Sequence, residues 1–318
     1  MAVLVGFTSS VAIVFAAAQA LGATEAQTAS RVWALGLGMG VTSLGLSLWY
    51  RQPVLTAWST PGAALIAATH GIAMPEAIGA FMLCAVLITL AGYSGAFERV
   101  MNQLPMAVAA ALLAGVLTRF ALNAALAGGR APVLVGAMTL ALLAGRRWWP
   151  RYAVPGVLLA GMAVAAALGL LHLGGVHWAW AAPVWTAPQF SWAATIGLAL
   201  PLFVVTMASQ NLPGVAAQRA SGYDTPVSPV VGATGLASLL LAPLGGYALN
   251  LAAITAAICM GREAHEDPRR RYMAAVAAGV FYIALGLAGG GVVGLLAAFP
   301  RELVDAVAGL ALLGTIAA

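Results

Sequence analysis

The sequence predicts an all-α polytopic membrane protein with an inverted internal repeat and two interrupted spans. The chain of 318 residues is 62% hydrophobic and only 7% charged, with a mean hydropathy of +0.97, whereas soluble domains carry about 25% charged residues. Apolar segments of membrane-spanning length recur along nearly the whole chain. Two of these segments are broken near their starts by Pro, Gly, Ser, Thr or Asn, in corresponding places of the two halves.

The predicted spans follow one another closely and leave no room for a soluble domain. Uninterrupted apolar segments cover 3–21, 31–49, 77–95, 105–126, 132–145, 153–172, 192–212, 228–241, 270–289 and 303–316. A weaker, glycine-rich segment covers 289–299, and the interrupted segments cover 53–69 and 243–260, which makes thirteen crossings if every segment crosses. No basic region precedes the first segment, so we interpret it as a span rather than a cleavable signal peptide.

The basic residues orient these spans. All 14 are Arg, and most lie in short loops, which is typical of the cytoplasmic side of a bacterial inner membrane. A cytoplasmic N-terminus leaves only Arg31 and Arg130 in outside loops and only Arg119 within a span. The segment 176–191 is rich in Trp and lacks Lys and Arg, so we expect an external loop there. This distribution excludes nucleic acid as a partner despite the net charge of +5.

The internal repeat is detected by shifting the chain by about 190 residues. The first span then falls on 193–211, the second on 221–239, and Pro53 on Pro243. Seven spans separate the two copies, and an odd number inverts the second copy relative to the first. Interrupted segments in corresponding positions of inverted halves indicate a transporter binding site.

Each interrupted segment predicts a helix that begins within the membrane. Ser59 or Thr60 suits an N-cap and Pro61 suits the first helical position. In the second copy the Gly245–Gly246 pair permits an extended or turned backbone, and Asn250 is expected to cap the next helix. Two helix N-termini brought together make a site for an anion or a carbonyl-rich molecule. The alternative is that both segments are loops between ordinary helices.

The charged residues favour an anionic cargo. All nine carboxylates lie in loops or at span ends, whereas a cation carrier usually places one within the membrane. Arg119 is either a counter-ion or gate residue, or a snorkelling or helix-contact residue. The four His residues are scattered, so no metal site and no cofactor is predicted, and Cys84 and Cys259 lie in apolar segments without implying a disulfide. The stretch 206–223 reads as a polar wall, Ser209 to Asn211, followed by a helix end and a cytoplasmic turn from Pro213.

Four stretches resemble the bacterial benzoate/proton symporters of the BenE family, and the resemblance runs from about residue 3 to residue 316. They are "LVGFTSSVAIVFAAAQALGA", "RQPVLTAWSTPGAAL", "ASQNLPGVAAQRASGY" and "LLAPLGGYALNLAAITAAICMGREAHEDPRRRY". More distantly, the layout is similar to nucleobase permeases and sulfate-type anion transporters. The resemblance implies a seven-plus-seven inverted repeat. It implies a core domain from 1–100 (spans 1–4) and 192–289 (spans 8–11), and a gate domain from 101–175 (spans 5–7) and 290–318 (spans 12–13), with 176–191 as the external loop.

The same resemblance places the substrate between spans 3 and 10, beside spans 1 and 8. The expected carboxylate ligands are Ser59, Thr60, Gly246, Tyr247 and Asn250. Ser209, Gln210 and Asn211 would complete the polar wall, with Gln19 as the repeat partner of Ser209, and the aromatic ring would face Trp58, Phe7 and Tyr247.

The sequence departs from the related pattern in two respects. Nucleobase permeases bear Glu in spans 8 and 10, but the matching positions here are Ser209 or Gln210, and Leu249 before Asn250. This departure agrees with an anionic cargo and leaves the proton carrier open, since the cargo carboxylate itself can carry the proton. The family fold has fourteen spans and this chain ends after the thirteenth, so the last span is expected to be missing, either from a fragment or by nature.

These features predict a secondary transporter that imports benzoate or a related aromatic carboxylate with protons. The alternatives are a transporter or uniporter of another organic or inorganic anion, a channel, and an intramembrane enzyme. The enzyme is disfavoured because no His lies mid-span to activate a Ser. The expected partners are the cargo, protons and the lipid bilayer, with a homodimer as a further option.

Overall fold

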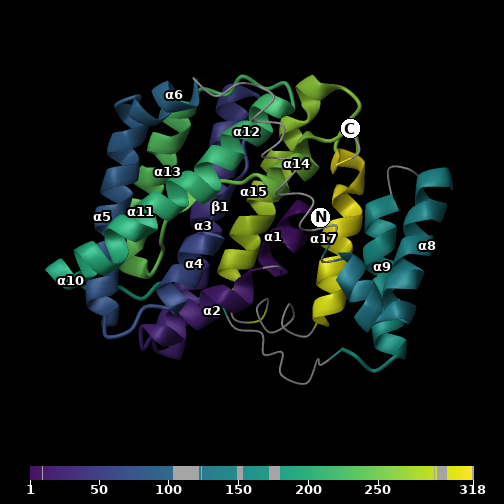
Figure 1. The fold of residues 1–318 in the computed structure, drawn as a ribbon, viewed down its shortest axis with the longest axis horizontal. Helices are drawn as coiled ribbons and strands as arrows, with labels where there is room; N and C mark the ends of the chain where they lie inside the picture. Colours follow the sequence, from purple (N-terminus) through teal and green to yellow (C-terminus); the bar gives the residue numbers. More distant parts are fainter. Residues whose placement is uncertain are drawn as a thin grey trace.

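A computed structural model describes residues 1–8, 10–102, 122, 124–148, 153–171, 180–289, 291 and 299–316. These residues form a mostly helical protein (Figure 1). Five helices in the described part are long and apolar enough to cross a membrane, covering Glu25–Tyr50, Met74–Tyr93, Trp192–Ala220, Val227–Leu244 and Pro268–Leu287. Arg119 and most of the predicted segments 105–126 and 289–299 lie outside the described residues.

The first half of the chain contains two departures from the predicted spans. The first span is two helices, α1 (Ala2–Thr8) and α2 (Val11–Ala20), rather than one. The second span, α3 (Glu25–Tyr50), begins earlier than predicted because Thr24 and Gln27 form a capping box. The remaining elements of this half are β1 (Thr56–Trp58), α4 (Thr60–Ala67), α5 (Met74–Tyr93) and α6 (Ala96–Met101).

The early start of α3 corrects the position of Arg31. We expected Arg31 in an outside loop, and this prediction is wrong. The residue lies about 9 Å along the helix from Glu25, at 1.5 Å per residue, and its side chain is completely buried. Arg31 therefore lies within a helix of membrane-spanning length, Glu25–Tyr50.

The second half has the same order of elements from its long first helix onward. That helix, Trp192–Ala220, is continuous but contains two π-helical turns. The described elements that follow α6 along the chain are α8 (Pro132–Trp148), α9 (Ala153–Ala167), α10 (Trp192–Ala194), η3 (Thr195–Ala199), α11 (Leu200–Thr206), η4 (Met207–Asn211), α12 (Leu212–Ala220), α13 (Val227–Leu241), η5 (Ala242–Leu244), β2 (Leu249–Leu251), α14 (Ile254–Met260), η6 (Pro268–Arg270), α15 (Tyr272–Leu287) and α17 (Arg301–Ile316).

Each long helix of the first half packs against a long helix of the second half. Helix α3 packs along α15, and α13 packs along α5. Both pairs approach closely at glycines. A side chain on Gly36 would meet the backbone nitrogen of Gly286 at 2.9 Å, and one on Gly92 would meet Cα of Gly232 at 2.7 Å. Small residues of this kind allow helix backbones to come together within a membrane.

Both predicted extended stretches are present, and they pair with each other. Strands β1 and β2 are antiparallel, with Thr56 opposite Leu251, Ala57 opposite Asn250, and Trp58 opposite Leu249. Each strand leads directly toward a short helix, α4 or α14. The crossing of the two interrupted segments therefore lies in the middle of the described fold (Figure 1).

The buried apolar residues form two clusters. The larger joins α1 to α5 with α11 to α15, and the smaller joins α8, α9 and α17. Figure 1 shows α8, α9 and α17 side by side at one edge of the molecule. Helix α1 contributes to both clusters, because Phe7 belongs to the larger and Val5 to the smaller.

Candidate functional site

Serines of the long helices hold both strands. The hydroxyl of Ser43 in α3 accepts a hydrogen bond from the backbone nitrogen of Thr56 at 2.9 Å. The hydroxyl of Ser238 in α13 does the same for the nitrogen of Leu249 at 2.8 Å. All four residues are buried. A strand within a membrane needs such partners because water is not available to its backbone.

The start of α4 is also held by a side chain. Ser59 is the N-cap, and its hydroxyl accepts from the backbone nitrogen of Gly62 at 3.1 Å. The same oxygen accepts from the hydroxyl of Thr206 in α11 at 3.1 Å. Ser59 therefore caps the half-helix and ties it to the opposite repeat, while Thr60 occupies the first helical position.

The "MASQN" stretch forms the π-helical turn η4 (Met207–Asn211). Asn211 points into the protein, and its side-chain oxygen accepts from the nitrogen of Leu251 in β2 at 2.9 Å. Gln210 lines a pocket, and Ser209 is exposed. π-helical turns occur frequently at functional sites because the added residue changes which side chains face inward.

This turn also corrects the predicted helix end at Pro213. The helix continues through Pro213 to Ala220. Pro213 is tolerated because it lies in the first turn after η4, where the wider turn has interrupted the regular hydrogen-bond ladder.

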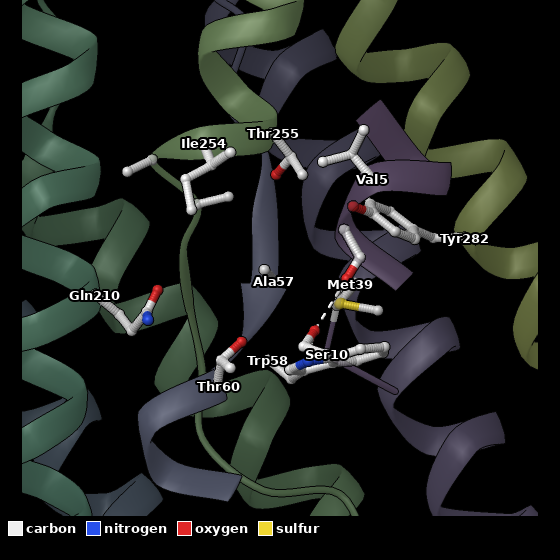
Figure 2. A pocket seen from close by; sticks show the side chains of 13 residues that line it. Val5, Ser10, Met39, Ala57, Trp58, Thr60, Gln210, Ile254, Thr255 and Tyr282 are labelled. Atoms are coloured by element: carbon white, nitrogen blue, oxygen red, sulfur yellow. Dashed lines mark hydrogen bonds between the residues drawn. The ribbon is translucent and has the colours of Figure 1, made fainter. Parts of the chain in front are cut away.

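A pocket lies where α1, η4, α15 and the two interrupted segments meet. It holds about 490 Å³ of empty space, including its open mouth. Figure 2 shows Gln210 on one side and Tyr282 on the other, with Thr255 at one end and Thr60 and Trp58 at the opposite end. The lining residues are Val5, Gly6, Ser10, Met39, Ala57, Trp58, Thr60, Gln210, Ala252, Ala253, Ile254, Thr255 and Tyr282.

The pocket combines aromatic rings with uncharged polar groups. The indole nitrogen of Trp58 donates to the hydroxyl of Ser10 at 2.9 Å, and that hydroxyl donates to the carbonyl of Gly6 at 3.0 Å. Phe7, which is not part of the lining, packs edge-on against Trp58, with 4.8 Å between ring centroids. None of the thirteen lining residues is charged. The pocket thus offers hydroxyl and amide groups beside apolar walls.

Three of the residues predicted to bind cargo line this pocket, namely Trp58, Thr60 and Gln210. Phe7 supports the Trp58 ring, while Ser59 and Asn211 hold the backbone around the pocket. The others lie elsewhere: Gly246 and Tyr247 are buried outside the lining, and Ser209 and Gln19 are exposed.

The predicted capping role of Asn250 is wrong. Helix α14 begins at Ile254 with Ala253 as N-cap and without a side-chain cap. Asn250 lies in the middle of β2 instead. In the orientation that satisfies its amide, its oxygen accepts from the nitrogen of Ser59 and its nitrogen donates to the carbonyl of Leu251, each at 3.0 Å. Because Asn250 pairs with Ala57 in the sheet, it stays in β2, four residues before the first residue of α14.

Ten of the thirteen lining residues were not predicted, among them Ser10, Met39, Thr255 and Tyr282. Ser10 is the last residue of the polar run in "FTSS", which signals the break between α1 and α2. Thr255 is the first polar side chain after β2. Tyr282 is an isolated polar aromatic residue within an apolar span. Met39 carries no such signal.

The sequence matches to known proteins include every residue of the site. The family model described as "Benzoate membrane transport protein" matches residues 1–318. The "Inner membrane protein YdcO" of Escherichia coli (strain K12) is 48% identical over 317 residues, which are 99% of this chain and 81% of that protein. The "Benzoate membrane transport protein" of Acinetobacter baylyi (strain ATCC 33305 / BD413 / ADP1) is 41% identical over 318 residues, which are 100% of this chain and 81% of that protein.

Proposed function

This chain belongs to the benzoate membrane transport protein family, and from that premise we propose that it imports benzoate or a related aromatic carboxylate by secondary active transport. The family comprises membrane transporters, so the chain is not an enzyme. The observation that carries the proposal is the uncharged pocket where the two interrupted segments cross, with aromatic and hydroxyl-bearing side chains on facing sides.

The chemistry of the pocket suits both ends of an aromatic carboxylate. Trp58 and Tyr282 offer ring faces and edges to the aromatic body. Thr60, Thr255 and Gln210 offer hydroxyl and amide donors to the carboxylate oxygens. Desolvating the carboxylate is costly unless such donors replace water. We place the ring between Trp58 and Tyr282 and the carboxylate toward Thr60 and Gln210.

Alternating access would move the core domain, 1–100 and 192–289, against the gate domain, 101–175 and 290–318. The separate apolar cluster of α8, α9 and α17 supports this division. Val5 reaches from the pocket into that cluster, so the pocket lies at the proposed boundary. The matched Ser43 and Ser238 bonds support the inverted seven-plus-seven repeat.

Proton coupling in this proposal uses the cargo as the proton carrier. The described residues that line the pocket include no carboxylate and no His, so none of their side chains has an ordinary pKa near neutral pH. The cargo carboxyl can bind a proton on the acidic outer side of the membrane and release it in the cytoplasm. In this proposal the N-terminus lies on the cytoplasmic side. An inward pH gradient would then drive accumulation.

Uptake of radiolabelled benzoate into proteoliposomes tests the proposal. We expect saturable uptake that is faster with an acidic exterior, and accumulation that collapses when a protonophore dissipates the gradient. Uptake in protein-free liposomes under the same gradient is the control, because the neutral acid crosses lipid unaided. Saturable uptake whose rate does not depend on the pH gradient would indicate a uniporter. Flux that does not saturate with benzoate concentration would indicate a channel. No protein-dependent uptake would contradict benzoate as cargo.

A further inference from the structure

Arg31 is a buried cation without a counter-charge among the described residues. Its side chain is fully buried within helix α3. The side-chain atoms Nε and Nη1 have no hydrogen-bond partner in the described part of the chain, and Nη2 has only the sulfur of Met74, at 3.4 Å. The ion pair found among the described residues joins Arg270 and Asp267 at the surface. An Arg stays protonated in proteins, so the charge of Arg31 persists.

Aromatic side chains surround this charge. The guanidinium lies 5.8 Å from the centroid of the Phe81 ring. The ring of Tyr247 lies 5.9 Å from that of Phe81, centroid to centroid. The Tyr247 hydroxyl is also buried and has no hydrogen-bond partner among the described residues. Two buried polar groups without hydrogen-bond partners among the described residues therefore lie beside the same Phe81 ring.

We propose that Arg31 and Tyr247 form a binding site for a compact inorganic anion of the size of chloride, separate from the cargo pocket. The free N–H groups of Arg31 can only donate, and the Tyr247 hydroxyl can donate as well. Their shared ligand must therefore accept hydrogen bonds. Water accepts them but leaves the positive charge uncompensated, and an unpaired buried charge costs several kcal/mol. An anion satisfies both requirements.

The site is distinct from the cargo pocket in its residues and in its chemistry. Neither Arg31 nor Tyr247 lines the pocket, which carries no charge. Arg31 is completely buried, and the contacts of its guanidinium include the Phe81 ring and the Met74 sulfur. This enclosure favours a monatomic anion over an aromatic carboxylate. The anion would neutralise Arg31 and fasten α3 to the segment that enters β2. The proposal does not depend on the identity of the cargo.

Thermal unfolding of the purified protein tests the site. The protein is prepared in sodium gluconate and titrated with sodium chloride at constant ionic strength. We expect a saturable rise in melting temperature of at least about 3 °C. In Tyr247→Phe, which loses only the hydroxyl, we expect the half-saturating chloride concentration to rise at least about fivefold. Equal melting temperatures of the wild type in gluconate and in chloride would overturn the proposal.

A second variant separates anion binding from general packing. Arg31→Met removes the charge, so it should be at least as stable as the wild type in gluconate and should show no response to chloride. The exposed Arg130→Gln is the matched control and should keep the full chloride response. If Arg31→Met does not fold, the comparison of the wild type with Tyr247→Phe decides. A response to benzoate at Arg31 without any response to chloride would overturn the inorganic anion and place Arg31 on the cargo route.

Discussion

The indole nitrogen of Trp58 donates a 2.9 Å hydrogen bond to the hydroxyl of Ser10. This bond links the first interrupted segment to the break between α1 and α2, and both residues line the pocket. It holds the plane of the Trp58 ring, which forms one end of the pocket (Figure 2). The orientation of the proposed ring-binding surface therefore depends on a residue from a different span.

Trp58→Phe should weaken benzoate transport without unfolding the protein. The variant keeps an aromatic ring but loses the hydrogen bond and part of the contact surface. A buried hydrogen bond contributes about 0.5–1.5 kcal/mol, so we expect KM to rise about 3- to 10-fold. Ser10→Ala leaves the indole N–H without its partner and should have a similar effect. Unchanged KM in both variants, measured by proteoliposome uptake, would remove Trp58 from the binding site.

Gln210→Ala and Ser209→Ala form a matched pair on one helical turn. Gln210 faces the pocket and Ser209 is exposed. We expect Gln210→Ala to raise the benzoate KM about 3- to 10-fold through loss of an amide donor, and Ser209→Ala to behave as the wild type. Equal changes in KM for the two variants would mean that η4 does not turn Gln210 into the pocket and Ser209 away from it.

Ser43→Ala and Ser238→Ala should both destabilise the protein by similar amounts. Each removes the acceptor of a buried strand nitrogen, that of Thr56 or that of Leu249. An unsatisfied buried N–H costs about 1–3 kcal/mol. Thermal unfolding in detergent would measure the losses. Thr139→Ala is a suitable control, because the Thr139 hydroxyl donates to the carbonyl of Val135, one turn earlier in its own helix, and to no strand among the described residues. A loss as large in the control would indicate that strand anchoring is not the cause.

Gly245→Ala should destabilise the protein more than Gly222→Ala. Both glycines have positive φ, 91° and 80° respectively, and a non-glycine residue in that region costs about 1–2 kcal/mol. A Cβ at Gly245 would also approach Cβ of Arg31 at 3.2 Å, whereas a Cβ at Gly222 meets nothing within 4 Å. Comparison of melting temperatures measures the difference. Equal destabilisation would mean that the contact with Arg31 has no energetic consequence.

The interrupted segments were predictable because their signals are local. Ser59 followed by Pro61 predicts a helix start wherever the stretch lies, and the structure places the cap at Ser59. Gly245 permits the positive φ that turns the chain into β2. That such segments recur at one offset also predicted that they would meet, and β1 pairs with β2.

The details of the site were not predictable in the same way, because they depend on contacts between distant residues. Nothing in "MASQN" by itself specifies a π-helical turn. The turn lets Asn211 bond to Leu251 while Gln210 reaches the pocket. The strand pairing similarly decides that Asn250 bonds to Ser59 rather than capping α14. Arg31 was misplaced because an apolar span was expected to begin after a charge, whereas Thr24 begins the helix before it.

The location of the cargo tests the central claim most directly. A structure of the protein bound to 4-bromobenzoate, with the bromine located by anomalous scattering, would place both ends of the molecule. We predict the bromine-bearing ring between Trp58 and Tyr282, and the carboxylate within hydrogen-bonding distance of Thr60 or Gln210. A bromine position outside this pocket, with the pocket itself empty, would contradict the account.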